Sequence, residues 1–188
     1  MQEMTPDQYC QSKAAASGSS FYYSFMFLPP DKRRAITALY AFCREVDDVV
    51  DECSDQQVAR TTLNWWRAQV AEIYGGKPQH PVAIALVPVV RQFNLAQELL
   101  LEIIDGMEMD LDHPRYPDFK SLQLYCYRVA SVVGLLSAEI FGRTDAMYVK
   151  FCSGPTPTYG RPGAMTAVIS GITYCSSPSF ETKLSERK

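Results

Sequence analysis

The segment Tyr40–Asp51, with the sequence YAFCREVDDVVD, sets three aspartates and an arginine among apolar residues. Asp47 and Asp51 are four residues apart, so on a helix their carboxylates share one face. Two carboxylates one turn apart repel each other, and this repulsion costs stability unless a cation lies between them. The segment therefore predicts either a solvated helix surface or a site for a positive ion.

The apolar residues around this segment predict one long helix, from a cap at Asp31 to about Cys53. Its polar side chains form a ridge that contains Tyr40, Arg44, Asp47 or Asp48, and Asp51. Because the other faces are apolar, we expect the ridge to lie inside the protein. The apolar positions that recur at steps of three and four residues are Ile36, Leu39, Phe42, Cys43, Val46, Val49 and Val50.

A pair of acidic side chains on a largely buried helix favours Mg²⁺, which takes oxygen ligands, keeps several waters and is often shared with substrate phosphates. Arg44 lies three residues before Asp47 and can hold a phosphate through two parallel hydrogen bonds. The candidate metal ligands are Asp47, Asp48 and Asp51. From this segment alone, a solvated face with charges spaced by four residues remains an alternative.

Further helices are predicted along the first three-quarters of the chain, which makes the fold class all-α, with helices packed around a central space. Capping boxes at Thr5 and Asn94 mark two helix starts. The segment 21–30, FYYSFMFLPP, is expected to be extended or irregular. No convincing strand alternation precedes Gly142. The other expected helices span about residues 57–74, 81–93, 94–112 and 118–141.

Two later segments are also candidates for a site. In LEIIDGMEMDLD, residues 101–112, acidic side chains follow one helix face, and Gly106 indicates close packing or close approach of a ligand. In YCYRVASVVGLL, residues 125–136, small side chains leave room for a neighbouring helix or for a long apolar ligand. Taken alone, residues 101–112 are better explained as an amphipathic helix with an acidic face. Residues 125–136, taken alone, are better explained by tight helix packing.

Composition excludes several classes of function. A net charge of −3 argues against general nucleic-acid binding. The chain has six scattered cysteines without a Cys-x-x-Cys pair and two histidines, so a zinc site is disfavoured and free thiols are expected. No apolar run reaches the roughly 18–20 residues that span a bilayer, and no export leader is evident. We expect a cytoplasmic protein.

After about Tyr148 the chain becomes rich in Gly, Pro, Ser and Thr, and the helical period is lost. We therefore expect a helical domain over residues 1–143 and a divergent, disordered tail over residues 144–188.

The ordered segments resemble the squalene/phytoene synthase family of head-to-head prenyl transferases. The likeness rests on SGSSFYYSFMFLP, YAFCREVDDVVD, IDGMEMDL and YCYRVASVVG, in this order, and covers about residues 4–143. Within the family it is strongest to bacterial enzymes of hopanoid biosynthesis that make presqualene diphosphate.

The resemblance implies an isoprenoid synthase-type helical bundle around a central apolar cavity. It implies an enzyme that joins two C15 or C20 allylic diphosphates with the help of Mg²⁺. It implies that Asp47 and Asp51 bind Mg²⁺ with Asp48 beside them, and that Arg44 and Tyr40 contact the diphosphate. Tyr125 would be the catalytic residue, a proton acceptor near the departing diphosphate. Phe21, Val129 and Val133 would line the prenyl cavity. The expected partner is farnesyl diphosphate, and peripheral association with the inner membrane face is a further expectation because the products are lipids.

The sequence departs from the family pattern in one respect. The family has a second aspartate-rich motif on a later helix, and no Asp-x-x-x-Asp follows Tyr148 here. We therefore expect a truncated or frame-shifted product with an incomplete bundle and impaired coupling. The alternatives are a non-catalytic fragment that binds prenyl diphosphate or a partner, coupling of C20 diphosphates as in phytoene synthases, and a helical scaffold without ligand chemistry.

Overall fold

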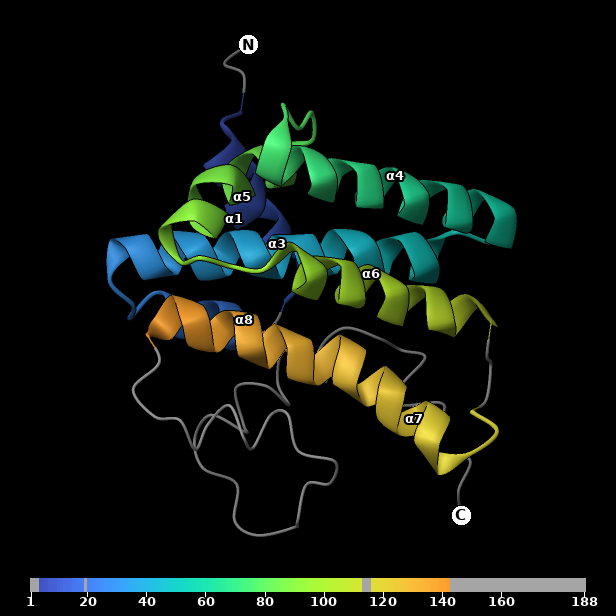
Figure 1. Ribbon diagram of the computed structural model, residues 1–188. Coiled ribbons are helices and arrows are strands. Elements are labelled where there is room, and N and C mark those ends of the chain that lie inside the picture. The colour runs from blue at the N-terminus through green and yellow to red at the C-terminus, as the bar shows by residue number, and fades with distance from the viewer. Residues whose placement is uncertain (1–3, 19, 113–115, 143–188) are drawn as a thin grey trace, which may run out of the picture.

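The computed structural model describes residues 4–18, 20–112 and 116–142, and every regular element in these ranges is helical (Figure 1). The predicted all-α fold is thereby confirmed, whereas the predicted tail, residues 144–188, lies outside the described residues. The elements are α1 (Pro6–Ala16), α2 (Ser20–Phe25), α3 (Pro30–Glu52), α4 (Gln56–Gly75), α5 (Pro81–Gln92), α6 (Gln97–Asp112), α7 (Phe119–Cys126), the π-helical η1 (Tyr127–Ser131) and α8 (Val132–Phe141).

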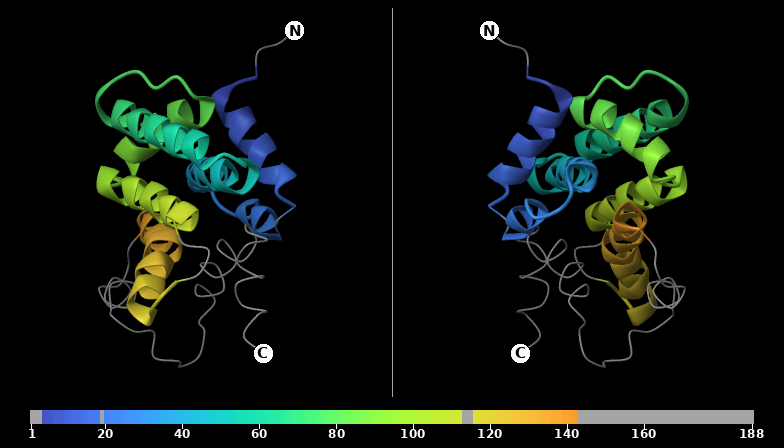
Figure 2. Two further views of the ribbon diagram at one scale, coloured as in Figure 1. Left: turned by 90° about the vertical axis from the view of Figure 1, so that its right-hand side faces the viewer. Right: turned by 90° about the vertical axis from the view of Figure 1, so that its left-hand side faces the viewer.

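Helix α3 is the central element of the bundle. It packs against α1, α2, α4, α5, α6 and α8, and Figures 1 and 2 show it enclosed by these neighbours. Its residues 35–42 are all buried, and the Phe42 ring meets Trp66 of α4 edge-on at 5.7 Å between centroids. Because α3 gives up most of its apolar surface to neighbours, its polar residues are held in fixed positions.

Helices α7, η1 and α8 follow one another without a break from Phe119 to Phe141. Asp118 caps the start as predicted, since its Oδ1 accepts from the Ser121 amide at 2.7 Å. At the other end, Lys32 of α3 donates to the Phe141 carbonyl at 2.6 Å. The stretch is long and apolar enough to cross a membrane, which the sequence reading missed, but half of it is buried in the bundle, as a core helix would be.

Three local predictions are wrong. Asp31 does not cap α3, because the helix begins one residue earlier, at Pro30, whose fixed φ suits the first helical position. Residues 20–25 form the short helix α2 instead of an extended segment, because Phe25 turns into the core and meets the Tyr40 ring at 5.9 Å between centroids. Fewer than two turns are too short to show a helical period. Helix α6 begins at Gln97, since Asn94 has a φ of 50° and does not start a helix. The capping box at Thr5 is confirmed.

Helix α6 crosses η1 at Gly106, and the approach leaves no room for a side chain. A Cβ at this position would lie 2.8 Å from Val129 Cγ1 and 2.9 Å from Arg128 Cβ. Close packing is therefore the reason for this glycine, one of the two explanations that the sequence offered. The π-helical turn of η1 lies at the same crossing, and such turns often occur near functional sites.

We predict that Gly106→Ala destabilises the protein by about 1–2 kcal/mol, although alanine favours helices, because the added methyl group forces α6 and η1 apart. Urea unfolding followed by circular dichroism measures the change. The matched control is Gly75→Ala near the end of α4, where a Cβ meets nothing within 4 Å. That variant should be neutral or slightly more stable. Equal behaviour of the two variants would contradict the packing explanation.

Candidate functional site

The three aspartates of α3 differ in their environments. Asp47 is buried, with 7% of its surface exposed, Asp48 is half-buried, and Asp51 is exposed one residue before the helix ends at Glu52. The predicted burial of the ridge therefore holds for Asp47 and is lost toward Asp51. The Arg44 guanidinium joins the two inner carboxylates, with Nη1 at 3.0 Å from Asp47 Oδ2 and Nη2 at 2.9 Å from Asp48 Oδ1.

The charge of Asp47 is only partly compensated. Burial raises the pKa of Asp47 to about 7, and the negative charges of Asp51, Asp48 and Asp110 add to the rise, while Arg44 opposes it. Burial is the largest cause of the rise in pKa and is not a charge effect, but the negative charges of Asp51, Asp48 and Asp110 together outweigh the positive charge of Arg44 at this carboxyl. The site is therefore suited to accept a further positive charge.

Asp110 of α6 forms the facing wall of the site together with two tyrosines. The Tyr125 hydroxyl donates to Asp110 Oδ2 at 2.8 Å, and the Tyr116 hydroxyl donates to Oδ1 at 3.3 Å. Burial, and then the charge of Asp110, raise the pKa of Tyr125 far above its usual range, and Asp47 contributes to the same rise. Tyr125 therefore remains a neutral phenol, and it lies within electrostatic reach of Asp47 on α3.

Sequence reasoning passed over Asp110, although a signal was present. The acidic stripe of this helix follows residues 102, 105, 108 and 112, and Asp110 lies about 140° around the helix from Asp105. An aspartate on the apolar face of an amphipathic helix needs a buried polar partner. That partner is Tyr125, fifteen residues later in the chain.

The acidic stripe itself is paired with arginines and is not part of the site. Arg60 of α4 bonds Glu108 at 3.1 Å and also bonds Asp112. Arg67 of α4 lies 2.6 Å from both Asp105 and Glu108. On the other side, Arg128 of η1 bonds Glu102 at 2.8 Å. These ion pairs connect α6 to its neighbours and agree with a structural role for the stripe.

The remaining predicted site residues lie in several places. The Tyr40 hydroxyl donates to Ser17 Oγ beside α1 at 3.0 Å, so this ring is turned toward α1 and α2. Val129 and Val133 are buried, Val129 at the α6 crossing. Phe21 belongs to α2. The structure thus brings Asp47, which Arg44 bonds, within electrostatic reach of Tyr125, and the roles of all these residues remain predictions.

The donor set fits a divalent cation in part. Among the described residues, no group of three or more His, Cys, Asp or Glu side chains is arranged to hold a metal. Asp47 and Asp51 nevertheless share a face, and repulsion from Asp51 contributes to the raised pKa of Asp47. Two carboxylates are enough for Mg²⁺ when waters and phosphate oxygens complete its shell. The residues present are therefore compatible with a Mg²⁺–phosphate complex.

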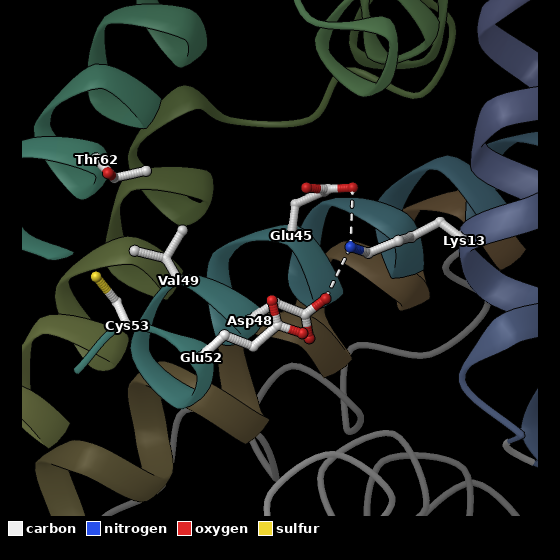
Figure 3. Close-up of a pocket in the computed structure, with 7 residues that line it drawn as sticks. All are labelled: Lys13, Glu45, Asp48, Val49, Glu52, Cys53 and Thr62. Atoms are coloured by element: carbon white, nitrogen blue, oxygen red, sulfur yellow. Dashed lines mark ion pairs between the residues drawn. The ribbon is translucent and has the colours of Figure 1, made fainter. Parts of the chain in front are cut away.

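A polar pocket of about 310 Å³ lies on the side of α3 that faces α1 and α4 (Figure 3). Its lining includes the ammonium of Lys13, which pairs with Glu45 at 3.1 Å and with Asp48 at 2.7 Å. Neither Asp47 nor Asp51 lines it. This pocket therefore differs from the apolar cavity that was expected. Its lining residues are Lys13, Glu45, Asp48, Val49, Glu52, Cys53 and Thr62.

Comparison with known proteins identifies the family of this fold and site. The family model described as "Squalene/phytoene synthase" matches residues 14–153. The chain belongs to the squalene/phytoene synthase family. It is 42% identical over 151 residues to presqualene diphosphate synthase of Zymomonas mobilis, covering 76% of this chain and 52% of that protein. It is 38% identical over 152 residues to 15-cis-phytoene synthase of a Synechocystis strain, covering 76% and 45%.

Solved structures of the squalene/phytoene synthase family show the same bundle. A dehydrosqualene synthase in complex with ligand superposes with a TM-score of 0.64 at 32% identity, covering 72% of this chain and 47% of that chain. Squalene synthase HpnC from Alicyclobacillus acidocaldarius superposes with a TM-score of 0.70 at 26% identity, covering 78% and 55%. The chain spans about half the length of these relatives. Membership supports an enzyme of the prenyltransferase class in isoprenoid biosynthesis.

We predict that Asp47→Asn stabilises the protein at neutral and alkaline pH. Because the folded-state pKa of Asp47 is raised to about 7, the folded protein binds more protons than the unfolded chain between about pH 4 and 7. Wild-type stability should therefore fall as the pH rises through this window. The variant lacks the charge, so its advantage should grow from near zero at pH 4 to about 1–3 kcal/mol at pH 8.

Urea unfolding without divalent ions, repeated from pH 4 to pH 8, measures this difference. Asp31→Asn, at an exposed position in the first turn of the same helix, is the control and should not gain stability as the pH rises. A constant difference between Asp47→Asn and the wild type across this range would contradict the raised pKa.

Proposed function

We propose that this chain provides a diphosphate and Mg²⁺ site for the head-to-head condensation of two farnesyl diphosphates to presqualene diphosphate. The observation that carries the proposal is the arrangement of Arg44 between Asp47 and Asp48, with the pKa of the buried Asp47 raised to about 7. This combination provides a guanidinium for a phosphate and an excess of negative charge for a metal ion. Similarity to presqualene diphosphate synthases supports the C15 substrate.

Asp47 and Asp51 would hold Mg²⁺, and the ion, when bound, neutralises charge on the leaving diphosphate. Arg44 orients that diphosphate through its guanidinium and adds a second positive charge. Val129 and Val133 lie on the helical stretch that carries Tyr125, and Phe21 lies on α2. We propose that these three side chains exclude water from the carbocation that forms when the allylic diphosphate ionises.

Tyr125 accepts the proton that the coupled prenyl cation loses as the cyclopropane ring closes. A neutral phenol is a weak base, but the Tyr125 hydroxyl already donates to Asp110 at 2.8 Å. As the phenol oxygen takes a proton from the substrate carbon, its own proton passes to the Asp110 carboxylate, and charge balances. Asp110 thus supplies the basicity that the phenol lacks.

A second candidate function is binding of prenyl diphosphate without turnover. It is favoured by the lack, among the described residues, of any group of three or more metal-ligating side chains. Coupling of C20 diphosphates is supported by the similarity to phytoene synthases, and substrate length distinguishes it from the C15 reaction.

The test is incubation of the full chain with farnesyl diphosphate and Mg²⁺, followed by assay of pyrophosphate and mass spectrometry of the lipid extract. We expect presqualene diphosphate and one pyrophosphate for each product, and a loss of at least about 100-fold in Asp47→Asn. Lys32→Met, which removes a positive charge at the far end of α3, should retain the wild-type rate.

Other results separate the candidates. Geranylgeranyl diphosphate as the only substrate that turns over would favour the C20 reaction. A Mg²⁺-dependent rise in melting temperature with farnesyl diphosphate, but without pyrophosphate release, would favour binding alone. No thermal shift and no product would refute both.

A further inference from the structure

Asp48 differs from its neighbours because both of its carboxylate oxygens are bonded to cations. Oδ1 lies 2.9 Å from Arg44 Nη2. Oδ2 lies 2.7 Å from Lys13 Nζ, a contact that Figure 3 shows. Because each oxygen of Asp48 is already bonded to a cation, a metal ion would have to compete with one of these contacts. This geometry argues against the direct Mg²⁺ contact that the sequence predicted for Asp48.

Lys13 belongs to α1, so its ion pair with Asp48 is a tertiary contact that joins α1 to α3. The same ammonium lies 3.1 Å from Glu45, which also accepts from the Tyr9 hydroxyl at 2.8 Å. The result is a continuous chain of ion pairs from α1 to the ridge, in the order Lys13, Asp48, Arg44, Asp47.

We propose that Lys13 is a positioning residue that acts through Asp48 to hold the Arg44 guanidinium in place for a diphosphate, and that Asp48 is a link in this chain and not a metal ligand. The proposal rests on the proposed function, in which Arg44 binds the diphosphate. A free arginine side chain has several rotatable bonds, and ordering them on binding costs affinity. An anchored guanidinium has already met most of this cost.

Lys13 acts indirectly because of its position. Its ammonium lines the pocket between α1, α3 and α4, whereas Asp47 and Asp51 are absent from that lining. Its nearest carboxylates, those of Asp48 and Glu45, lie 2.7 Å and 3.1 Å away. Loss of Lys13 should therefore matter only while Arg44 is present to be positioned.

The experiment measures the affinity of the full chain for inorganic pyrophosphate in excess Mg²⁺ by titration calorimetry. We expect about tenfold weaker binding in Lys13→Met and a larger loss in Arg44→Met. The double variant Lys13→Met/Arg44→Met should bind as weakly as Arg44→Met alone, since residues in one chain are not additive. Lys13→Arg should restore most of the affinity.

Tyr9→Phe is the matched control, because it removes a hydrogen bond from the same α1–α3 contact without touching Asp48. It should leave pyrophosphate affinity unchanged. Asp48→Asn interrupts the chain at its other end and is the second variant in case Lys13→Met does not fold. It should cost the same factor as Lys13→Met and leave the Mg²⁺ concentration for half-maximal binding unchanged.

Several results would overturn the proposal. Unchanged pyrophosphate affinity in Lys13→Met would do so. A weaker affinity in the double variant than in Arg44→Met alone would also do so, because it would mean that Lys13 contacts the diphosphate itself. A raised Mg²⁺ requirement confined to Asp48→Asn would make Asp48 a metal ligand. If the wild-type chain binds no pyrophosphate with Mg²⁺, the proposed diphosphate site falls and this inference falls with it.

Discussion

The site depends on one electrostatic constraint, a carboxylate buried among other carboxylates. Asp47 lies inside the bundle beside Asp51, Asp48 and Asp110, and Arg44 alone does not bring its pKa back to the usual range. The helix tolerates this arrangement because α3 is held by packing against six neighbouring helices. Packing of the core thus holds these carboxylates together despite their repulsion. The resulting excess of negative charge can bind a cation that carries a diphosphate.

The two walls of the site come from segments far apart in the chain. Helix α3 carries the aspartates, and the stretch from α6 to η1 carries Asp110 and Tyr125. Within the second wall, the absence of a side chain at Gly106 lets α6 approach η1 closely. The arginines that pair with the acidic stripe of α6 hold the same helix from the α4 side. Structural and chemical residues therefore occupy different faces of α6.

Much of this arrangement could be predicted from sequence because it is local. The period of apolar residues predicts α3, and the spacing of Asp47 and Asp51 places them on one face. Tertiary partners are not encoded in such patterns. The role of Asp110 becomes visible only through its hydrogen bond with Tyr125. The role of Asp48 becomes visible only through its ion pair with Lys13, which lies on a separate helix. Helix α2 escaped prediction since fewer than two turns show no period.

The most direct measurement is the pKa of the Asp47 carboxyl by ¹³C NMR, with and without Mg²⁺ and pyrophosphate. In the free protein we expect a pKa of about 7, caused by burial and by the neighbouring carboxylates. With Mg²⁺ and pyrophosphate bound, the pKa should fall well below that value, because a bound cation favours the charged form. An ordinary pKa of about 4 in the free protein, or no change on adding both ligands, would contradict this view of the site.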